Sequence, residues 1–164
     1  MTVTVEHDFD VMFRAQFSRL VSLGVAMCGR RDIAYELAQE TMLRAHRRWD
    51  DLAEYDVSGA WLRRVMVNLL IDHHRSRTAE RAAVERLAGR GEAVVEPPSI
   101  DRWHELVSHL PPQQRAIVSL YYADDQSVEA IAEVLDISTG AVKKSLFKAR
   151  QTLQRRLAEE VRDA

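Results

Sequence analysis

The 164-residue chain lacks most of the features that mark secreted or membrane proteins. Its one cysteine, Cys28, excludes an internal disulfide and suits a reducing compartment. No apolar run approaches the roughly 20 residues that span a bilayer, so we expect no membrane insertion. The N-terminal residues lack the basic segment and apolar run of a secretory signal peptide. These absences predict a cytoplasmic protein.

An excess of positive charge is also missing, because the formal net charge is −2. A protein that binds nucleic acid unaided usually carries a net basic domain, since neutralising phosphates supplies much of the affinity. Any binding of nucleic acid by this chain should therefore be weak and should depend on a second component.

No catalytic or metal-binding motif stands out. His73 and His74 are adjacent, so a helix would point them about 100° apart, and no C-x-x-C or H-x-x-x-H spacing occurs. A catalytic triad order, a glycine-rich phosphate loop and paired acids are absent as well. The sequence predicts no metal, no cofactor and no enzymatic activity of its own.

Apolar residues recur at helical spacing along most of the chain, and no strand pattern survives. We expect an all-α fold with two small helical domains, residues 5–87 and 100–160, joined by a flexible linker at 88–99 that holds two glycines and a proline pair. In the first domain Asp8 is the expected N-cap of the first helix, and residues 50–59 are expected to be a polar connection. In the second, Ser127 and Ser138 are the expected caps of the last two helices.

The last third of the chain separates its charges. Residues 124–136 hold five acids and no base, and residues 137–157 hold six bases and no acid. The apolar residues of the basic stretch share one helix face, and the lysines fall largely off that face. Those apolar residues are Val142, Leu146, Ala149, Leu153 and Leu157. A short acidic helix, a tight turn and a basic helix are typical of a helix-turn-helix that binds a polyanion.

The turn between these two helices supports this interpretation. Asp136 stands where a left-handed backbone is needed, and Ile137 is an apolar plug. The start of the basic helix directs backbone N–H groups outward, which suits a phosphate. A lysine-rich helix is more often only a solvated surface, but the turn, the plug and the lack of acids favour DNA. The expected DNA-contacting residues are Ser138, Thr139, Lys143, Lys144, Ser145, Phe147, Lys148 and Arg150.

Three stretches on either side of the linker resemble a known family. They are RRDIAYELAQETMLRAHRRWDDL, AWLRRVMVNLLIDHHRSR and LPPQQRAIVSLYYADDQSVEAIAEVLDISTGAVKKSLFKARQTLQRRL. In this order they are similar to the motifs of extracytoplasmic-function (ECF) sigma factors of the sigma-70 family. The resemblance implies a dissociable specificity subunit of bacterial RNA polymerase, with sigma region 2 in the first domain and region 4 in the second. Such a subunit reads the −35 and −10 promoter elements and promotes melting at −10.

The resemblance also implies roles for individual residues. The residues implied to dock on the largest polymerase subunit are Glu36, Leu37, Gln39, Glu40, Leu43, Arg44 and Arg47. The residues implied to contact the −10 element are Trp61, Arg63, Arg64, Asn68, Arg75 and Arg77. Asn68 matches the position that holds a base flipped from the non-template strand. Trp61 could stack on a base, although an aromatic residue that begins a helical stripe is more often part of a core.

The implied partners are core RNA polymerase, through its largest and second-largest subunits, and promoter DNA. Many members of the family also bind an inhibitory anti-sigma factor. This chain departs from the family pattern at Tyr35 and His46, which leaves docking details open. Lys144 and Ser145 stand where serine and arginine are frequent, so an arginine that could bind guanine in two places is missing. We therefore predict an unusual −35 preference.

Two other classes remain open at this point. An autonomous regulator could carry the same helix-turn-helix beside a dimerisation or sensing domain, and it should then bind DNA tightly by itself. A helical enzyme or an adaptor is disfavoured by the missing catalytic site and by the two basic helices.

Overall fold

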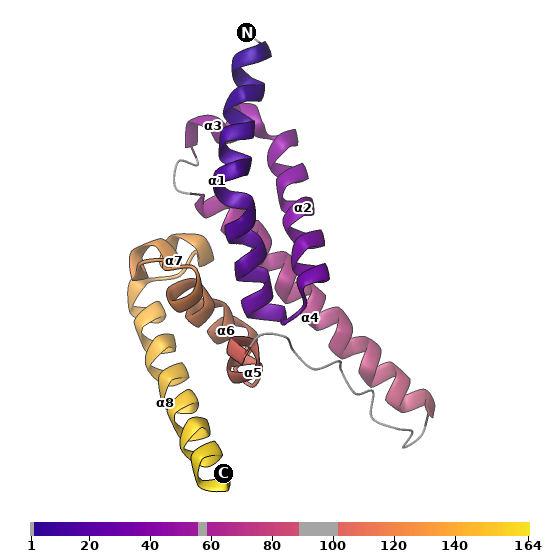
Figure 1. Cartoon of the computed structure of the whole chain (residues 1–164), viewed down its shortest axis with the longest axis vertical. Helices are drawn as coiled ribbons and strands as arrows, with labels where there is room; N and C mark the ends of the chain where they lie inside the picture. Colours follow the sequence, from indigo (N-terminus) through magenta and orange to yellow (C-terminus); the bar gives the residue numbers. More distant parts are fainter. Residues whose placement is uncertain (1, 56–58, 89–101) are drawn as a thin grey trace.

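The computed structural model describes residues 2–55, 59–88 and 102–164, and every regular element in these ranges is helical (Figure 1). This confirms the all-α prediction. The predicted linker falls almost entirely on residues 89–101, outside the described ranges, while Ala88 ends the preceding helix.

Four helices form the N-terminal half: α1 (Thr2–Cys28), α2 (Arg31–Arg47), α3 (Trp49–Tyr55) and α4 (Ala60–Ala88). α1 and α2 form a helical hairpin, with Gly29 at φ 71° in the connection. Small residues allow the helices to approach closely. A Cβ atom at Gly24 of α1 would lie 2.7 Å from the Ala34 Cβ of α2 and 2.8 Å from the Met66 Cε of α4. Only glycine fits at this crossing without displacing a neighbour.

The C-terminal half contains α5 (Arg102–Val107), α6 (Pro112–Val118), the single π-helical turn η1 (Ser119–Ala123), α7 (Val128–Leu135) and α8 (Thr139–Asp163). α7 and α8 form the predicted helix-turn-helix. The Oγ atoms of Ser127 and Ser138 accept hydrogen bonds from the N–H groups of Ala130 and Ala141 at 3.1 and 3.0 Å, which confirms both caps. Asp136 has the left-handed backbone expected of it, with φ 54° and ψ 49°.

Two local predictions were wrong. α1 begins at Thr2, so Asp8 lies inside the helix instead of capping it. Nothing between Thr2 and Asp8 breaks a helix, and the helix therefore continues upstream. The predicted polar connection at 50–59 contains α3, whose Trp49 ring packs edge-to-face on Phe9 at 5.4 Å and whose Leu52 is buried. Tertiary packing supports a helix that is too short and too polar to show periodicity.

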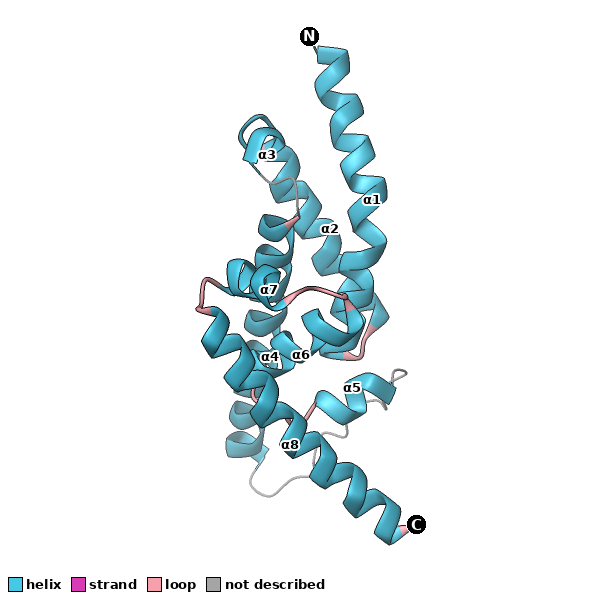
Figure 2. Cartoon of the chain, turned by 90° about the vertical axis from the view of Figure 1, so that its left-hand side faces the viewer, coloured by secondary structure: helices cyan, strands magenta, loops and turns pink. Residues whose placement is uncertain are grey.

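The two halves pack against each other in the described residues. α1 contacts α5 and η1, and α4 contacts α7. Buried residues of both halves belong to one hydrophobic cluster, from Leu20 and Met66 to Ile117 and Ile131. α8 packs on α6 and α7, and its C-terminal end points away from α1, α2 and α3 (Figure 2). We call this packed arrangement the closed form.

Candidate nucleic-acid and polymerase interfaces

The outer face of α8 carries cations in solvent. Lys143, Lys144 and Lys148 are exposed, and Phe147 among them is 61% exposed. Val142, Leu146 and Ala149 of the same helix turn the other way and are buried, whereas Leu157 near its end is 41% exposed. Ser138 and Thr139 lie exposed at the helix start, and Ser145 is half-buried. The main contacts between the two halves are made by α5, η1 and α7, so the closed form leaves this face of α8 open.

Arg150 differs from the lysines of α8, because it is tied to η1. Its Nε donates a 2.7 Å hydrogen bond to the Tyr122 hydroxyl. Its guanidinium lies 5.6 and 5.7 Å from the ring centroids of Tyr121 and Tyr122, within cation–π range. The hydrogen bond with Tyr122 raises the pKa of Arg150 above its ordinary value. Arg150 therefore links α8 to η1 in this structure, and it also adds positive charge to α8.

The basic residues at the start of α4 lie against the other half of the chain. Arg63 is 1% exposed and forms an ion pair with Asp124, with Nε 2.5 Å from Oδ2 and Nη2 3.4 Å from Oδ1. The Asp124 side chain is 4% exposed. Arg19 of α1 adds a second cation, with Nη2 3.6 Å from Asp124 Oδ1 and 3.2 Å from its backbone carbonyl oxygen. One carboxylate of the C-terminal half is thus held by two arginines of the N-terminal half.

Gly59 leaves the space that the Arg63 guanidinium needs for this ion pair. It has φ +75°, and a Cβ atom there would lie 2.6 Å from Arg63 Nη1. Its carbonyl oxygen accepts a hydrogen bond from the same nitrogen at 3.4 Å. A side chain at this position would be strained by the backbone and would also displace the guanidinium.

Arg64 contacts the end of α7. Its Nη2 and Nε donate to the carbonyl oxygens of Glu133 and Val134 at 2.6 and 3.0 Å. The last carbonyls of a helix have no partner within the helix and lie at the negative end of its dipole. Arg64 therefore stabilises the end of α7. The same guanidinium belongs to the set of residues implied to bind the −10 element, so in the closed form it is already engaged.

The other residues implied to contact −10 DNA differ in their exposure. Asn68 and Arg75 of α4 are exposed, whereas Arg77 is half-buried beside a cavity between the halves. Trp61 is half-buried, packs against the core, and has the Arg48 guanidinium 5.8 Å from its ring centroid. This packing favours the core interpretation of Trp61. The closed form therefore brings Arg63 and Arg64 together against the C-terminal half, with Asn68 outside.

The residues implied to dock on polymerase lie on the outside of α2. Its inner face is built from Ala34, Ala38, Thr41, Met42 and Ala45, all buried. Glu36, Gln39, Leu43, Arg44 and Arg47 are exposed, and Leu37 and Glu40 are half-buried. Leu43 is 53% exposed, and the Arg44 Nε lies 2.8 Å from Glu40 Oε1. α2 packs on α1, α3 and α4, so the closed form leaves this face accessible.

Cys28 is half-buried at the end of α1. Burial raises the pKa of the Cys28 thiol, whose Sγ lies 3.4 Å from the Arg30 carbonyl oxygen. Among the described residues, no three His, Cys, Asp or Glu side chains gather closely enough to hold a metal ion. The same ranges contain no helix that is both long enough and apolar enough to cross a membrane.

A two-domain helical architecture with a helix-turn-helix and a second basic helix is typical of a transcription factor. Residues 12–80 match the model of Sigma-70 region 2, and residues 100–153 match that of Sigma-70, region 4. The chain is 32% identical to the RNA polymerase sigma-E factor of Streptomyces avermitilis over 133 residues, which cover 80% of this chain and 74% of that protein. It is 27% identical to the ECF RNA polymerase sigma factor SigW of Bacillus subtilis over 157 residues, which cover 86% and 84% of the two chains. The chain belongs to the sigma-70 family and is an ECF RNA polymerase sigma factor.

Solved structures show the same fold. The sigma factor RpoE of Bartonella quintana, in complex with the anti-sigma factor NepR, matches with a TM-score of 0.72 at 23% identity, over 92% of this chain and 97% of that one. CnrH, in complex with the cytosolic domain of CnrY, matches with the same TM-score and identity, over 92% and 88% of the two chains. These structures confirm the helical fold, and the sequence matches confirm the predicted family.

Proposed function

We propose that this sigma factor docks on core RNA polymerase through the outer face of α2, contacts the −35 element with α8, and captures the −10 strand with α4. Three separate helices carry the three faces, so one chain can serve all three tasks at once. The outer face of α2 combines acids, arginines and the exposed Leu43, which suits a coiled-coil surface of a large partner. The predicted partners are the largest and second-largest polymerase subunits and promoter DNA. The chain acts as a specificity subunit, and polymerase supplies the chemistry.

The observation that carries this proposal is that the C-terminal half engages basic residues of α4, with Arg63 buried and Arg64 exposed but bonded to α7, and leaves the other two faces free of such contacts. The α2 face and the α8 lysines are open in the closed form, whereas Arg63 and Arg64 are engaged by the C-terminal half. The free chain can therefore meet polymerase and duplex DNA but cannot use these two arginines on a −10 strand. Polymerase would separate the halves and hold them at promoter spacing, where each binding event raises the effective concentration of the next.

Melting is proposed to begin at Asn68. Its side chain is exposed on α4, one helical turn beyond Arg64. Extruding a base costs a few kcal/mol, least at A·T-rich steps, and a polar side chain that holds the extruded base offsets that cost. Arg64 and Arg75 would then bind the adjacent phosphates of the opened strand.

An anti-sigma factor is part of the proposal as a further partner. A protein that contacts both halves would stabilise the closed form in proportion to its concentration and affinity. The likeness to the fold of a sigma factor solved in complex with an anti-sigma factor supports looking for one. We also propose a cytoplasmic location, where polymerase is found.

Reconstitution with core polymerase and a randomised promoter library tests the proposal. We expect specific open complexes, detected by permanganate footprinting, only when polymerase and this chain are both present. Tight, site-specific footprinting by the chain alone, without association with core polymerase, would instead identify an autonomous regulator.

A further inference from the structure

The π-helical turn η1 lies between two arginine contacts of the closed form. The hydroxyl of Tyr122, within the turn, accepts the hydrogen bond from Arg150 of α8. Asp124, the next residue after the turn, carries the carboxylate that binds Arg63 of α4 and Arg19 of α1. One short turn therefore contacts both the helix proposed to bind duplex DNA and the arginines that join the halves.

The backbone of η1 differs in phase from an α-helix. The Asp124 N–H donates to the Ser119 carbonyl oxygen at 3.0 Å, in the i→i+5 pattern of a π turn. Such a turn holds one residue more than an α turn, and single π turns are frequent at functional sites. If η1 took α-helical hydrogen bonds, the residues after it would rotate by about 100° relative to α6. The Asp124 carboxylate would then leave Arg63.

Side chains of two helices hold η1 in the π form. Trp103 of α5 donates from Nε1 to the Ser119 Oγ at 3.3 Å, and its ring centroid lies 5.9 Å from that of Tyr122. Arg150 of α8 adds the 2.7 Å hydrogen bond to the Tyr122 hydroxyl and the cation–π contacts with Tyr121 and Tyr122. Tyr122 is 48% exposed and Arg150 is exposed, so another acceptor in solution can compete for this guanidinium.

A DNA phosphate is such a competitor. Lys143, Phe147 and Arg150 stand at i, i+4 and i+7 on one side of α8, and all three are exposed. A duplex that contacts Lys143 therefore brings phosphates within reach of Arg150. The Tyr122 hydroxyl is a neutral acceptor, whereas a phosphate is charged and can accept two parallel hydrogen bonds from one guanidinium.

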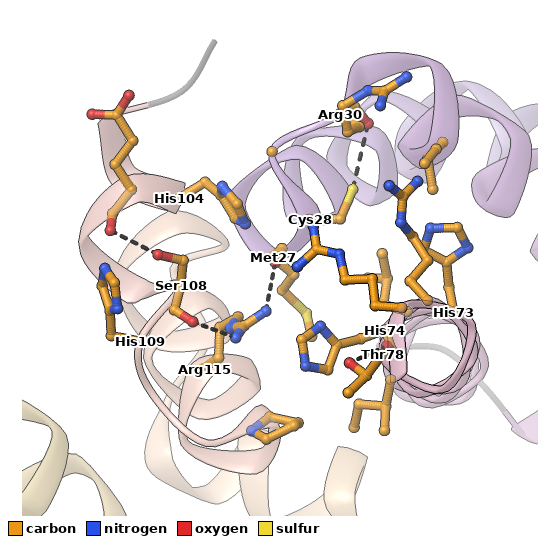
Figure 3. A pocket seen from close by; sticks show the side chains of 18 residues that line it. Met27, Cys28, Arg30, His73, His74, Thr78, His104, Ser108, His109 and Arg115 are labelled. Carbon is orange, nitrogen blue, oxygen red and sulfur yellow. Dashed lines mark hydrogen bonds between the residues drawn. The ribbon is translucent and has the colours of Figure 1, made fainter. Parts of the chain in front are cut away.

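α6 precedes η1 and has its own contact with the N-terminal half. Arg115 Nη1 donates to the Met27 carbonyl oxygen at 3.5 Å, beside the cavity between the halves (Figure 3). A change of phase in η1 leaves this contact in place, because Arg115 lies on the N-terminal side of the turn. α6 can therefore stay on α1 while α7 and the Asp124 carboxylate move away from α4.

We propose that η1 couples α8 to α4: a phosphate that binds Arg150 removes it from Tyr122, releases the π form of η1 and weakens the Arg63–Asp124 pair. The halves then open more often while α8 is on duplex DNA. The closed form still predominates, and polymerase completes the separation. The coupling is reciprocal, so opening the closed form strengthens the contact of Arg150 with DNA. This inference rests on the proposed function, because it takes α8 to bind duplex DNA.

Two substitutions test the link without DNA. Tyr122→Phe removes the hydroxyl, and Arg150→Gln removes the cation. Both should raise the hydrogen exchange rate of residues 60–68 about tenfold, the equivalent of one hydrogen bond to a charged group. Tyr35→Phe on α2 and Arg155→Gln on α8 make the same chemical changes at other exposed positions and should leave the rate unaltered. Circular dichroism verifies that each variant is folded.

A double-mutant cycle separates this link from a local loss of structure around Tyr122. If Tyr122 acts through the ion pair, Tyr122→Phe should add no further exchange when Asp124→Asn has already removed the carboxylate. Additive effects of the two substitutions would overturn the proposal. Exchange at the unaltered rate in either Tyr122→Phe or Arg150→Gln would overturn it as well.

A random-sequence duplex of about 20 base pairs at low salt tests the coupling to DNA, because phosphate contacts do not depend on sequence. We expect saturating duplex to raise the exchange of residues 60–68 about tenfold in the unaltered chain and no further in Tyr122→Phe. Direct cover of α4 by DNA would slow this exchange instead and would contradict the coupling. Fluorescence anisotropy measures binding separately. Binding without faster exchange overturns the coupling and leaves the proposed function standing, whereas a lack of binding overturns the proposed α8 contact as well.

Discussion

α4 and α8 are both basic helices for which we propose contacts with DNA, yet the closed form engages their basic residues differently. The lysines of α8 lie in solvent, whereas Arg63 of α4 is 1% exposed and Arg64 donates to the end of α7. Duplex DNA is available whenever the protein meets it, but an opened −10 strand exists only on polymerase. Under the proposed function, the helix that contacts duplex DNA is exposed, and the helix that contacts the opened strand has two of its cations engaged within the chain.

The two helices also differ in how their charges affect stability, because the lysines of α8 are exposed and Arg63 of α4 is buried in an ion pair. A lysine on an exposed helix contributes little to folding, because water and salt screen it. A buried pair such as Arg63–Asp124 is sensitive to the loss of either partner, because the remaining charge stays out of water. Opening the closed form should therefore depend on a few residues at α4, whereas binding by α8 should depend on the sum of many weak contacts.

Replacing Asp124 should produce the largest effect. Asp124→Asn leaves Arg63 without its carboxylate, and removing one member of a buried pair costs about 3–5 kcal/mol. We expect the halves to separate, seen as a larger radius of gyration in small-angle scattering and a lower unfolding midpoint. Asp125→Asn is the matched control, since Asp125 is exposed and asparagine tolerates its φ of 55°.

A double variant sharpens this test. Arg63→Met combined with Asp124→Leu replaces the pair by apolar side chains and should recover much of the lost stability. Unchanged shape and stability in Asp124→Asn would show that the ion pair does not hold the closed form.

Asn68→Ala should have the next largest effect, and only on the opened strand. One base-specific contact contributes about 1–3 kcal/mol, so we expect about tenfold or more weaker open-complex formation by permanganate reactivity. Binding to core polymerase should stay normal. Ser76→Ala, exposed on the same helix, is the control. Equal loss of core binding in Asn68→Ala would mean that Asn68 is structural.

Ser145→Arg tests the α8 side of the comparison. Ser145 is half-buried beside the exposed lysines, where an arginine fork could reach a guanine. We expect a new base preference at one −35 position, with about 1–3 kcal/mol of discrimination, measured on a randomised −35 library. Ser145→Lys is the control for added charge alone. An unaltered preference in Ser145→Arg would remove this residue from the set that selects bases.

The sequence could predict the local features, such as helix caps and turns, that depend on residues close together along the chain. The caps Ser127 and Ser138 and the left-handed Asp136 follow from residue type and position, and the structure confirms them. α3 could not be predicted, because the Phe9–Trp49 contact that stabilises it joins distant residues. The ion pair of Asp124 could not be predicted for the same reason, because its partner Arg63 lies 61 residues away.

Among the residues implied to bind DNA, the sequence could not show which ones the chain engages itself. Arg150 gives no local sign that it pairs with Tyr122, 28 residues upstream. Arg63 and Arg64 look equivalent to Arg75 by spacing and type, and only their contacts with Asp124 and the end of α7 separate them from it. Spacing along a helix predicts which residues share a face, but a second domain decides what covers that face.

The smallest expected effect distinguishes the two helices by salt dependence. Lys148→Ala should lower the slope of log affinity against log salt by roughly one, because one phosphate contact is lost, both for the free chain on duplex DNA and for the polymerase complex. Arg64→Ala should lower the slope only in the polymerase complex, because the free chain holds Arg64 at the end of α7. Arg162→Ala, near the end of α8, is the control and should leave both slopes unaltered. If Arg64→Ala lowered the slope of the free chain as much as Lys148→Ala does, α4 would be open in solution, and the difference between the two helices would lie in DNA recognition alone.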